Sequence, residues 1–233
     1  MKIVIVLPAY NCAKTLKRVI EEIPHNIISD IVLGDDHSSD ETLEVARKCG
    51  IKHIIQHDKN QGYGANQKTC YDKALELQAD VVIMLHPDYQ YNPSLITPII
   101  EQIHNGADIV FASRMMKGGE AMKNGMPAYK YYSNRLLSIF QNLCLKTNLS
   151  EYHTGYRAFK RKILLSIDYH SFSNDFIFDN QMIIEIIKRG YKIREIYCPA
   201  KYEKSSSSIN FQRSVKYGLQ VLYYTIKYLL SDK

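Results

Sequence analysis

A turn carrying metal-binding side chains follows an apolar stretch in the first half of the chain. Val81–Leu85 is a run of five apolar residues, which predicts a buried strand, and it is followed by His86-Pro87-Asp88-Tyr89-Gln90. Asp88 offers a carboxylate and Gln90 a carbonyl oxygen, and hard cations such as Mg²⁺ and Mn²⁺ take oxygen ligands of this kind beside substrate phosphates. His86 could be a further ligand for Mn²⁺, a hydrogen-bond partner of a ribose or phosphate, or a packing residue. The turn is a candidate site for a divalent cation.

Polar residues also follow two apolar runs nearer the N-terminus. After Ile3–Leu7 comes Pro8-Ala9-Tyr10-Asn11, where the ring of Tyr10 offers a flat surface on which a base can stack. After Asp30–Leu33 comes Gly34-Asp35-Asp36-His37-Ser38-Ser39-Asp40. The serines and Asp40 are typical helix caps. Capping does not explain Asp35 and Asp36, which could accept hydrogen bonds from a base N–H and from ribose hydroxyls.

A fourth polar segment, Asn60-Gln61-Gly62-Tyr63-Gly64-Ala65-Asn66, opens a predicted helix. Backbone N–H groups at a helix N-terminus can receive a phosphate, so Asn60 and Gly64 are candidate nucleotide-binding residues. The segment lacks the dinucleotide fingerprint and the Lys-Ser/Thr of the P-loop. A glycine turn that permits close packing is an equal alternative.

These polar segments gain meaning from the elements that must position them. Strands are predicted over Ile3–Leu7, Asp30–Leu33, Ile51–Gln56, Val81–Leu85 and Asp108–Ala112, and helices over Ala13–Ile23, Glu41–Lys48, Tyr63–Leu77 and Pro93–His104. This alternation predicts an α/β fold, a mostly parallel sheet with helices on both faces. The four polar segments then share the carboxyl edge of the sheet, where ligands bind in open α/β sheets.

The second half of the chain changes character. Met115–Pro127 is rich in Gly and Met and predicts a mobile loop, and Lys204–Ser208 predicts a second, polar one. Helices are predicted over Ala128–Leu145, Phe176–Arg189 and Gln212–Leu230, and strands over Ala158–Phe159 and Tyr191–Cys198. No repeat or linker divides the chain, so we expect one domain over residues 1–233, with a nucleotide-binding part over 1–115 and an acceptor-binding part over 116–233.

Composition narrows the class of protein. The chain has 233 residues, of which 45% are hydrophobic and 23% charged, and its formal net charge is +6. No run of Lys and Arg exceeds three residues, so a nucleic-acid partner is not expected, and the positive charge suits a phosphorylated substrate or an anionic membrane. Five scattered Cys without a CxxC pair, no signal-peptide pattern and no membrane-length apolar run predict a cytoplasmic protein.

The predicted C-terminal helix is amphipathic. Its apolar stripe includes Val215, Leu219, Leu222, Ile226 and Leu229. Packing of this stripe against the domain or against the second copy in a homodimer is the more economical interpretation. The alternative is a peripheral contact with the cytoplasmic face of a membrane.

Together the motifs resemble the family 2 glycosyltransferases with a GT-A fold, and among them the dolichol-phosphate mannosyltransferase-like branch. The resemblance covers roughly residues 1–200 and is dense over 1–115. The matching pieces are Ile3–Asn11, Asp35–Thr42, Asn60–Asn66, Pro87–Gln90, Ser113-Arg114 and His153-Thr154-Gly155-Tyr156-Arg157-Ala158-Phe159.

The resemblance implies roles for individual residues. Pro8, Tyr10, Asp35 and Asp36 would line the nucleoside pocket. Asp88 would be the metal-binding acid of a DxD-like motif, helped by Gln90, and Arg114 would face the donor or acceptor phosphate. Asp179 sits near the place of an acid that faces the acceptor. Two positions depart from the pattern, because Cys12 and His86 stand where acids are usual.

The implied reaction is an inverting transfer of a sugar from a UDP- or GDP-linked donor to a glycan, glycolipid or polyprenyl-phosphate acceptor, in cell-envelope or polysaccharide synthesis. Mg²⁺ or Mn²⁺ would neutralise the diphosphate leaving group. Asp179 would be the general base if the acceptor is a sugar hydroxyl, whereas a lipid phosphate is already anionic and requires no strong base. A cationic wall for phosphates could be formed by Arg114, Lys130, Arg135, Arg157 and Lys204, with the two predicted loops as lids.

Two rival functions remain at this stage. A sugar nucleotidyltransferase would carry a Gly- and Lys-rich N-terminal signature, which is missing. A sugar-nucleotide-binding protein with weak or lost catalysis is made conceivable by His86 in the DxD-like motif.

Overall fold

The computed structural model describes residues 1–199 and 211–231. Its first half confirms the predicted alternation of strands and helices. The elements are β1 (Ile3–Ala9), α1 (Ala13–Glu22), β2 (Asp30–Asp35), α2 (Thr42–Lys48), β3 (His53–Gln56), α3 (Tyr63–Glu76), β4 (Val81–Met84), the 3₁₀ turn Pro93–Leu95, α4 (Ile96–His104) and β5 (Ile109–Ser113).

Strands β1 and β2 run two residues further than their apolar patterns predict. The parallel ladder between them continues through the pairs Pro8 with Gly34 and Ala9 with Asp35. Asp35 is therefore the last residue of a strand rather than part of a loop. Strand β3, by contrast, begins two residues late, because the Ile51 amide still bonds the Ala46 carbonyl oxygen at the end of α2 (3.3 Å).

The strands form one sheet in the order β3-β2-β1-β4-β6-β5-β7, where β6 is Arg157–Lys160 and β7 is Ile193–Tyr197. All neighbours are parallel except β6, which is antiparallel to both β4 and β5. The prediction of a mostly parallel sheet is confirmed. The chain steps from β1 outward to β3 and then returns to the other side of β1 with β4. The carboxyl ends of β1 and β4 thus flank the point where the strand order reverses, which is where ligands bind in such sheets.

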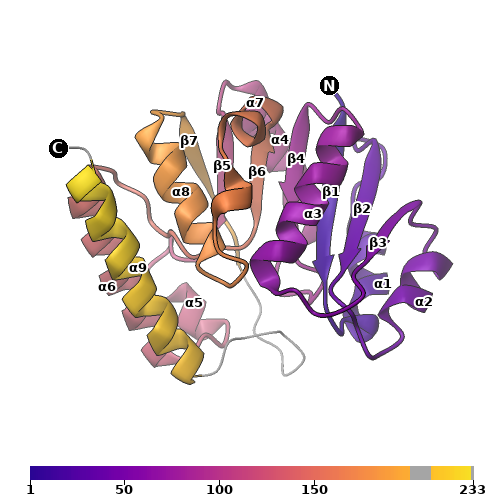
Figure 1. Ribbon diagram of the computed structural model, residues 1–233, viewed down its shortest axis with the longest axis horizontal. Coiled ribbons are helices and arrows are strands. Elements are labelled where there is room, and N and C mark those ends of the chain that lie inside the picture. Colours follow the sequence, from indigo (N-terminus) through magenta and orange to yellow (C-terminus); the bar gives the residue numbers. More distant parts are fainter. Residues whose placement is uncertain (200–210, 232–233) are drawn as a thin grey trace.

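Helices cover both faces of the sheet, and this explains why its strands read as continuous apolar runs. Side chains of a strand alternate between faces. In β1, Ile3, Ile5 and Leu7 join the core with α1 and α4, whereas Val4 and Val6 join the core with α3 and α8 (Phe178–Lys188). Figure 1 shows α3 and α8 on the near face of the sheet and α4 behind it.

The segment Met115–Pro127 is not the open loop that its glycines and methionines predict. It contains the short helix α5 (Glu120–Lys123), and the side chains of Met115, Ala121 and Met126 are buried with Tyr131 in a small cluster of their own. Gly119 precedes α5 with a left-handed backbone, so the glycines shape a turn and a helix start. Met115 and Met126 are packing residues, whereas Met116 is exposed.

The rest of the second half is mainly helical. It comprises α6 (Ala128–Leu145), α7 (Arg161–Ser166), the 3₁₀ turn Tyr169–Ser171, α8 and α9 (Phe211–Ser231). The range predicted for α6 is confirmed, whereas α7 was not predicted. Helices α6 and α9 lie side by side at one edge of the molecule, beyond α8 (Figure 1). In the part of the chain that the structure describes, no helix is both long enough and apolar enough to cross a membrane. The predicted loop Lys204–Ser208 lies outside the described residues.

Candidate active site at the carboxyl edge of the sheet

Backbone conformation marks the ends of three strands as unusual. Asn11 after β1, His37 after β2 and Tyr89 after β4 have φ angles of 50°, 63° and 60°. Non-glycine residues rarely adopt this left-handed conformation, and it tends to persist at sites where surrounding structure enforces it. Hydrogen bonds between the turns after β1 and β2 hold Asn11 in this conformation. The Asn11 amide donates to Ser38 Oγ (2.9 Å), and the Ser39 amide donates to Asn11 Oδ1 (2.8 Å).

The expected nucleoside side of the site combines an exposed ring with a buried acceptor. The side chain of Tyr10 is 55% exposed, whereas that of Asp35 is fully buried. Asp35 Oδ2 accepts a hydrogen bond from the Ser38 amide (3.1 Å), but its Oδ1 has no partner in the described chain. A buried carboxylate oxygen without a donor is costly, so this atom is suited to a ligand N–H or hydroxyl. Pro8 is buried in β1 beside it.

Asp36 has a different role from the expected one. Its Oδ1 accepts hydrogen bonds from His57 Nδ1 (2.8 Å) and the Gln61 amide (2.8 Å), and its Oδ2 accepts one from the Gly62 amide (2.9 Å). Asn60 Nδ2 also donates to the Asp36 carbonyl oxygen (3.2 Å). Asp36 and Asn60 therefore hold the loop before α3 in place, and the carboxylate of Asp36 is already occupied by that loop.

The start of α3 does not form the phosphate cradle that we considered for it. The Gly64 amide donates to the Asn174 carbonyl oxygen (2.8 Å). A Cβ atom at Gly64 would lie 2.6 Å from the Ser173 carbonyl oxygen and 2.7 Å from Phe178 Cβ. The alternative of a packing glycine is therefore correct, because the space and the N–H group at Gly64 are both taken by the segment before α8.

The metal-binding turn after β4 is fixed from the α1 side. Thr15 Oγ1 donates to the Pro87 carbonyl oxygen (2.6 Å), and the guanidinium of Arg18 lies over the ring of Tyr89 (3.6 Å). The side chain of Tyr89 thus points back to α1. Asp88 is half-buried, Gln90 is buried, and Asp88 Oδ1 accepts from the Gln90 amide (3.0 Å).

His86 is joined to Asp179 through Tyr63, a residue to which we had assigned no role. The Tyr63 hydroxyl donates to Asp179 Oδ2 (2.7 Å), and it lies 3.0 Å from His86 Nε2. Because the single phenolic proton goes to the carboxylate, the Tyr63 oxygen can only accept from His86, which places the imidazole proton on Nε2. The lone pair of the imidazole then lies on Nδ1, where it could bind a ligand.

Protonation states support this arrangement. Burial, and then the charge of Asp179, raises the pKa of the Tyr63 phenol well above its ordinary value, so it keeps its proton. Burial lowers the pKa of His86, opposed by the charges of Asp88 and Asp179, and favours the neutral imidazole. Gly155 allows the ring to approach bare backbone, because a Cβ there would lie 2.4 Å from His86 Nε2.

Arg157 is not part of a phosphate-binding wall. Its side chain is 1% exposed and donates to the carbonyl oxygens of Thr154 (2.8 Å), Asp179 (3.0 Å) and Tyr152 (3.2 Å). It also forms an ion pair with Asp179 Oδ1 (3.2 Å). Gln67 Nε2 donates to the same oxygen of Asp179 (3.1 Å). Arg157 therefore supports Asp179 from beneath, and both carboxylate oxygens of Asp179 have donors.

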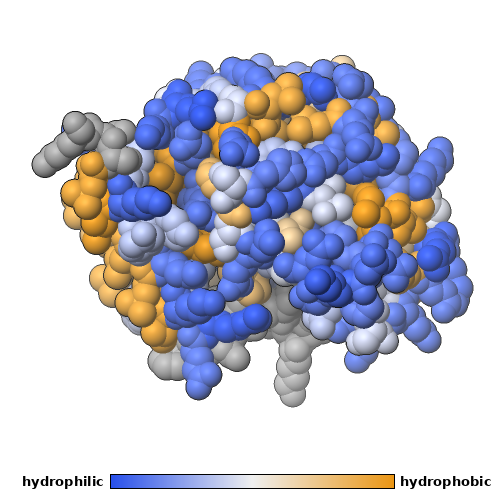
Figure 2. Space-filling model, in the orientation of Figure 1, coloured by the Kyte–Doolittle hydropathy of each residue, from blue (hydrophilic) through white to orange (hydrophobic). Residues whose placement is uncertain are grey.

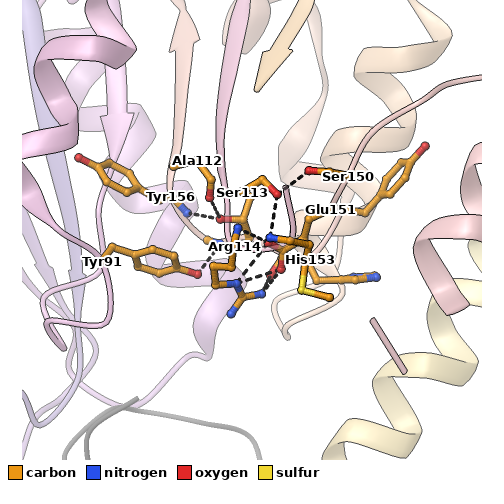
Figure 3. Close-up of polar contacts among 12 residues, drawn as sticks. Tyr91, Ala112, Ser113, Arg114, Ser150, Glu151, His153 and Tyr156 are labelled. Atoms are coloured by element: carbon orange, nitrogen blue, oxygen red, sulfur yellow. Dashed lines mark hydrogen bonds and ion pairs between the residues drawn. The ribbon is translucent and has the colours of Figure 1, made fainter. Parts of the chain in front are cut away.

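Arg114 lies at the end of β5 and is held by Glu151 (Figure 3). Arg114 Nε donates to Glu151 Oε1 (2.9 Å), its backbone amide donates to Glu151 Oε2 (2.8 Å), and its Nη2 donates to the His153 carbonyl oxygen (3.0 Å). Glu151 is fully buried and Arg114 is 8% exposed. This pairing fixes the guanidinium beside the His153-Thr154-Gly155 segment, and it neutralises part of the charge that we had expected to face a phosphate.

The other expected cations divide between two places. Burial, and then the charge of Arg114, lowers the pKa of Lys130. Arg135 is exposed and borders a separate hollow of about 380 Å³ with Ser150 and Glu195. Lys204 lies outside the described residues.

The donor set fits a divalent cation that is completed by substrate. Among residues 1–199 and 211–231, no group of three or more His, Cys, Asp and Glu side chains could enclose a metal. Mg²⁺ and Mn²⁺ do not need such a cage, because one or two protein ligands and the oxygens of a diphosphate suffice. Asp88, Gln90 and Nδ1 of His86 provide ligands of that kind on one turn.

A scan against family models matches the description "Glycosyl transferase family 2" over residues 4–167. The chain belongs to this family. It is a glycosyltransferase with the α/β fold of the GT-A enzymes, which confirms the resemblance read from its motifs. The nucleotidyltransferase alternative is thereby excluded.

Two curated relatives extend over most of the chain. A UDP-N-acetylglucosamine–dolichyl-phosphate N-acetylglucosaminyltransferase of Methanococcus voltae is 24% identical over 95% of this chain and 93% of its own length. A polyprenol monophosphomannose synthase of Mycolicibacterium smegmatis is 22% identical over 82% of this chain and 74% of its own.

Among solved structures, a glucosyl-3-phosphoglycerate synthase of Mycobacterium tuberculosis, in complex with Mn²⁺, UDP and phosphoglyceric acid, superposes with a TM-score of 0.73. The match covers 98% of this chain and 78% of that one at 16% identity. At this identity the likeness shows the shared fold.

Three residues that the structure brings into the site had no role predicted from the sequence: Tyr63, Glu151 and His153. His153 was noted only as part of a motif. Its Nδ1 lies 2.9 Å from the Tyr217 hydroxyl of α9, and its Nε2 is buried without a partner in the described chain. The only signal in the sequence was their position inside the glycine loop and inside the segment before Arg157.

Proposed function

We propose that this glycosyltransferase moves a sugar from a UDP- or GDP-linked donor to a polyprenyl-type lipid phosphate, with inversion at the anomeric carbon. A lipid phosphate oxygen forms the new bond to the anomeric carbon while the bond from that carbon to the diphosphate oxygen breaks. The nucleoside diphosphate leaves with the bonding electrons. No proton has to move, because the nucleophile is already anionic.

The hydrogen bonds that the carboxylate of Asp179 accepts are the observation on which the proposed acceptor rests. A sugar hydroxyl would require a general base with a free lone pair within hydrogen-bond reach of the attacking oxygen. Both oxygens of Asp179 already accept hydrogen bonds, from Tyr63 and from Gln67, and Arg157 forms an ion pair with one of them. We therefore assign Asp179 to positioning instead of proton transfer. An acceptor that needs no base, such as a lipid phosphate, suits this arrangement, and two relatives bear the names of enzymes for such acceptors.

Each part of the edge has a function in this proposal. Tyr10 stacks on the base, and Asp35 Oδ1 accepts a hydrogen bond from the base or ribose. Asp88, with Gln90 and His86 Nδ1, would hold Mg²⁺ or Mn²⁺, which would stabilise negative charge on the departing diphosphate. Arg114 and Lys130 would provide positive charge for the incoming phosphate. Because polyprenyl phosphates reside in bilayers, the enzyme would work as a peripheral protein at the cytoplasmic face of a membrane.

A thermal-shift screen of the wild-type chain and Asp88→Asn against UDP, GDP and their sugar conjugates, each with and without Mn²⁺, tests the donor site. We expect one nucleotide series to raise the melting temperature of the wild type in the presence of Mn²⁺ only, because ligand binding stabilises the folded state by mass action. Asp88→Asn should lose the Mn²⁺-dependent part. Equal shifts for both proteins, or no shift with any nucleotide, would refute the assignment of this edge as a donor site.

A further inference from the structure

Helix α6 presents an apolar stripe to the outside of the molecule. The side chains of Tyr129, Tyr132, Leu136, Ile139 and Leu143 are 44% to 76% exposed. Their spacing of three and four residues places all five on one side of the helix. The inner side of α6 is occupied by different residues, because Tyr131, Ser138, Gln141 and Leu145 are buried.

Helix α9 presents a matching stripe. Val215, Leu219, Tyr223, Ile226 and Leu230 are 47% to 67% exposed, and they also follow helical spacing. Its buried side carries Val221 and Thr225, and Gln141 Nε2 of α6 donates to Thr225 Oγ1 (3.3 Å). The two helices are therefore tied to each other along one side of each and leave ten large apolar side chains outside. Figure 2 shows hydrophobic residues, in orange, along the edge where Figure 1 places α6 and α9. We call this pair of stripes the α6–α9 surface.

The charged residues on helices α6 and α9 themselves have one sign. Helices α6 and α9 contain no Asp or Glu, although the whole chain has 24. They contain five cations, which are Lys130, Arg135, Arg213, Lys216 and Lys227. Large exposed apolar patches mark interaction sites, and a helix with apolar and basic sides and no acids is typical of those that bind at the interface of anionic membranes.

A second copy of the chain is a poor occupant for the same surface. In a symmetric dimer the same patch meets itself, so cations would face cations around the seam, with no acidic residue on either helix to compensate. An anionic bilayer avoids this repulsion and attracts each Lys or Arg near its surface.

The α6–α9 surface is also connected to the active site. The Tyr217 hydroxyl lies 2.9 Å from His153 Nδ1, and the carbonyl oxygen of His153 accepts a hydrogen bond from Arg114 Nη2 (3.0 Å). Lys216 Nζ forms an ion pair with Asp175 Oδ2 just before α8 (3.4 Å). Helix α9 therefore contacts the site on one side and is exposed on the other.

We propose that the α6–α9 surface docks the enzyme on an anionic lipid bilayer, with the apolar stripes in the interface and exposed cations such as Arg135 and Lys227 against the headgroups. Docking in this way places His153, Arg114 and Lys130 next to the membrane, where a lipid-linked phosphate is confined. The inference rests on the proposed function, because a bilayer-bound acceptor is the reason for the enzyme to dock there.

Vesicle co-sedimentation tests the docking without any donor or acceptor. The probes are vesicles of phosphatidylcholine alone and of an equimolar mixture with phosphatidylglycerol. The full chain should sediment with the mixed vesicles and much less with the neutral ones. Leu136→Gln and Leu219→Gln should each weaken binding roughly tenfold or more, since each removes a leucine from the interface. Lys227→Gln should weaken it about fivefold.

Matched controls come from exposed residues elsewhere. Leu165 on α7 is 61% exposed, and Lys52 is exposed before β3. Leu165→Gln and Lys52→Gln should bind mixed vesicles as the wild type does, and far-UV circular dichroism should show an intact fold for every variant. The proposal is overturned if the wild type ignores mixed vesicles or if the control variants weaken binding equally. It is also overturned if the wild type sediments in the ultracentrifuge as a dimer that Leu136→Gln dissociates.

The outcome is separable from that of the proposed function. Vesicle binding without nucleotide-sugar binding would leave the docking surface standing and refute the donor site. Transfer to a short, detergent-solubilised lipid phosphate without vesicle binding would do the reverse.

Discussion

At the scale of single residues, His86 stands where the family usually has an acid, and the structure shows it as part of a chain of hydrogen bonds with Tyr63 and Asp179. Tyr63 donates to Asp179 and accepts from His86, so the imidazole proton is placed on Nε2 and the lone pair of the ring is left on Nδ1. Neutral imidazole is a good ligand for transition metals, whereas Mg²⁺ prefers oxygen ligands. We therefore expect His86 to bias the site toward Mn²⁺.

Replacing Tyr63 by Phe should weaken the preference of the site for Mn²⁺ over Mg²⁺. The variant removes only the hydroxyl, so His86 Nε2 loses its acceptor and the ring can adopt either tautomer. In ¹⁵N NMR spectra, the wild type should show the Nε2–H form of His86, and Tyr63→Phe a mixture of tautomers. Affinity for Mn²⁺ in the presence of nucleotide should fall about tenfold, in the range typical of lost outer-shell partners, while affinity for Mg²⁺ should change little.

A suitable control is Tyr191→Phe, which also removes one hydroxyl bond, to Ser166 Oγ (2.8 Å), far along the chain from the turn. It should leave both the tautomer and the metal preference unchanged. If Tyr63→Phe keeps a pure Nε2–H tautomer, the hydrogen-bonded chain is not what orients His86.

His153 gives a pH dependence whose sign can be worked out. Burial, and then the charges of Arg114 and Arg157, lowers the pKa of His153 to about 3 from an ordinary value of 6.5. The folded state therefore holds the neutral ring while the unfolded chain takes up a proton below pH 6.5. The stability contributed by His153 is present above pH 6.5 and is lost as the pH falls toward 3.

Urea unfolding at pH 7.5 and pH 5 measures this effect. The wild type should lose more free energy of unfolding between the two pH values than His153→Gln, which cannot titrate but can still hydrogen-bond to Tyr217. Identical losses for the two proteins would show that His153 titrates normally in the folded state.

Residue types and strand ends could be predicted from the sequence, but hydrogen-bond partners could not. Asp88, Gln90, Tyr10 and Asp35 lie at the predicted edge because an apolar run reveals where each strand ends. Ligand-binding roles were predicted for Asp36 and Arg157 because both are charged residues within motifs typical of the family. The amides of residues 61–62, which bind Asp36, and the carbonyl oxygen of Asp179, which binds Arg157, belong to segments that only the folded chain brings near.

At the scale of elements, the alternation of strands and helices was readable because a parallel sheet covered on both faces produces continuous apolar runs. The place of β6 was not readable. A strand of four residues between β4 and β5, antiparallel to both, leaves no local sign of its neighbours. Met115–Pro127 was misread for a related reason, because methionines buried under a short helix and methionines in an open loop look alike in sequence.

Gly64 offers a test of the junction between α3 and α8. Gly64→Ala would place a Cβ atom 2.6 Å from a backbone carbonyl oxygen, and overpacking of this kind costs about 1–3 kcal/mol. Gly118→Ala is the matched control, because a Cβ there meets nothing within 4 Å. Urea unfolding should show a lower midpoint for Gly64→Ala and an unchanged one for Gly118→Ala. An unchanged midpoint for Gly64→Ala would restore the interpretation of this loop as an open phosphate cradle.

At the scale of the whole molecule, the sheet edge is proposed to bind the donor and the α6–α9 surface to bind the membrane that holds the acceptor. The carboxyl ends of β1, β2 and β4 gather the residues proposed for the donor, and Arg114 is linked to α9 through His153 and Tyr217. The net charge of +6 is not spread evenly, since α6 and α9 hold five cations without an acid. The amphipathic C-terminal helix was predicted from its stripe, but its pairing with α6 was not, and neither helix alone shows the extent of the surface.

The most direct measurement is transfer of radiolabelled sugar from UDP- and GDP-sugars to a short polyprenyl phosphate, with Mn²⁺ or Mg²⁺, by the wild type and by Asp88→Asn. We predict a labelled lipid from one donor series, a higher rate with Mn²⁺ than with Mg²⁺, and a loss of at least about a hundredfold in Asp88→Asn, equivalent to roughly 3 kcal/mol of transition-state stabilisation. Label that never leaves the nucleotide with any donor, or equal rates for the two proteins, would contradict the assignment of this site.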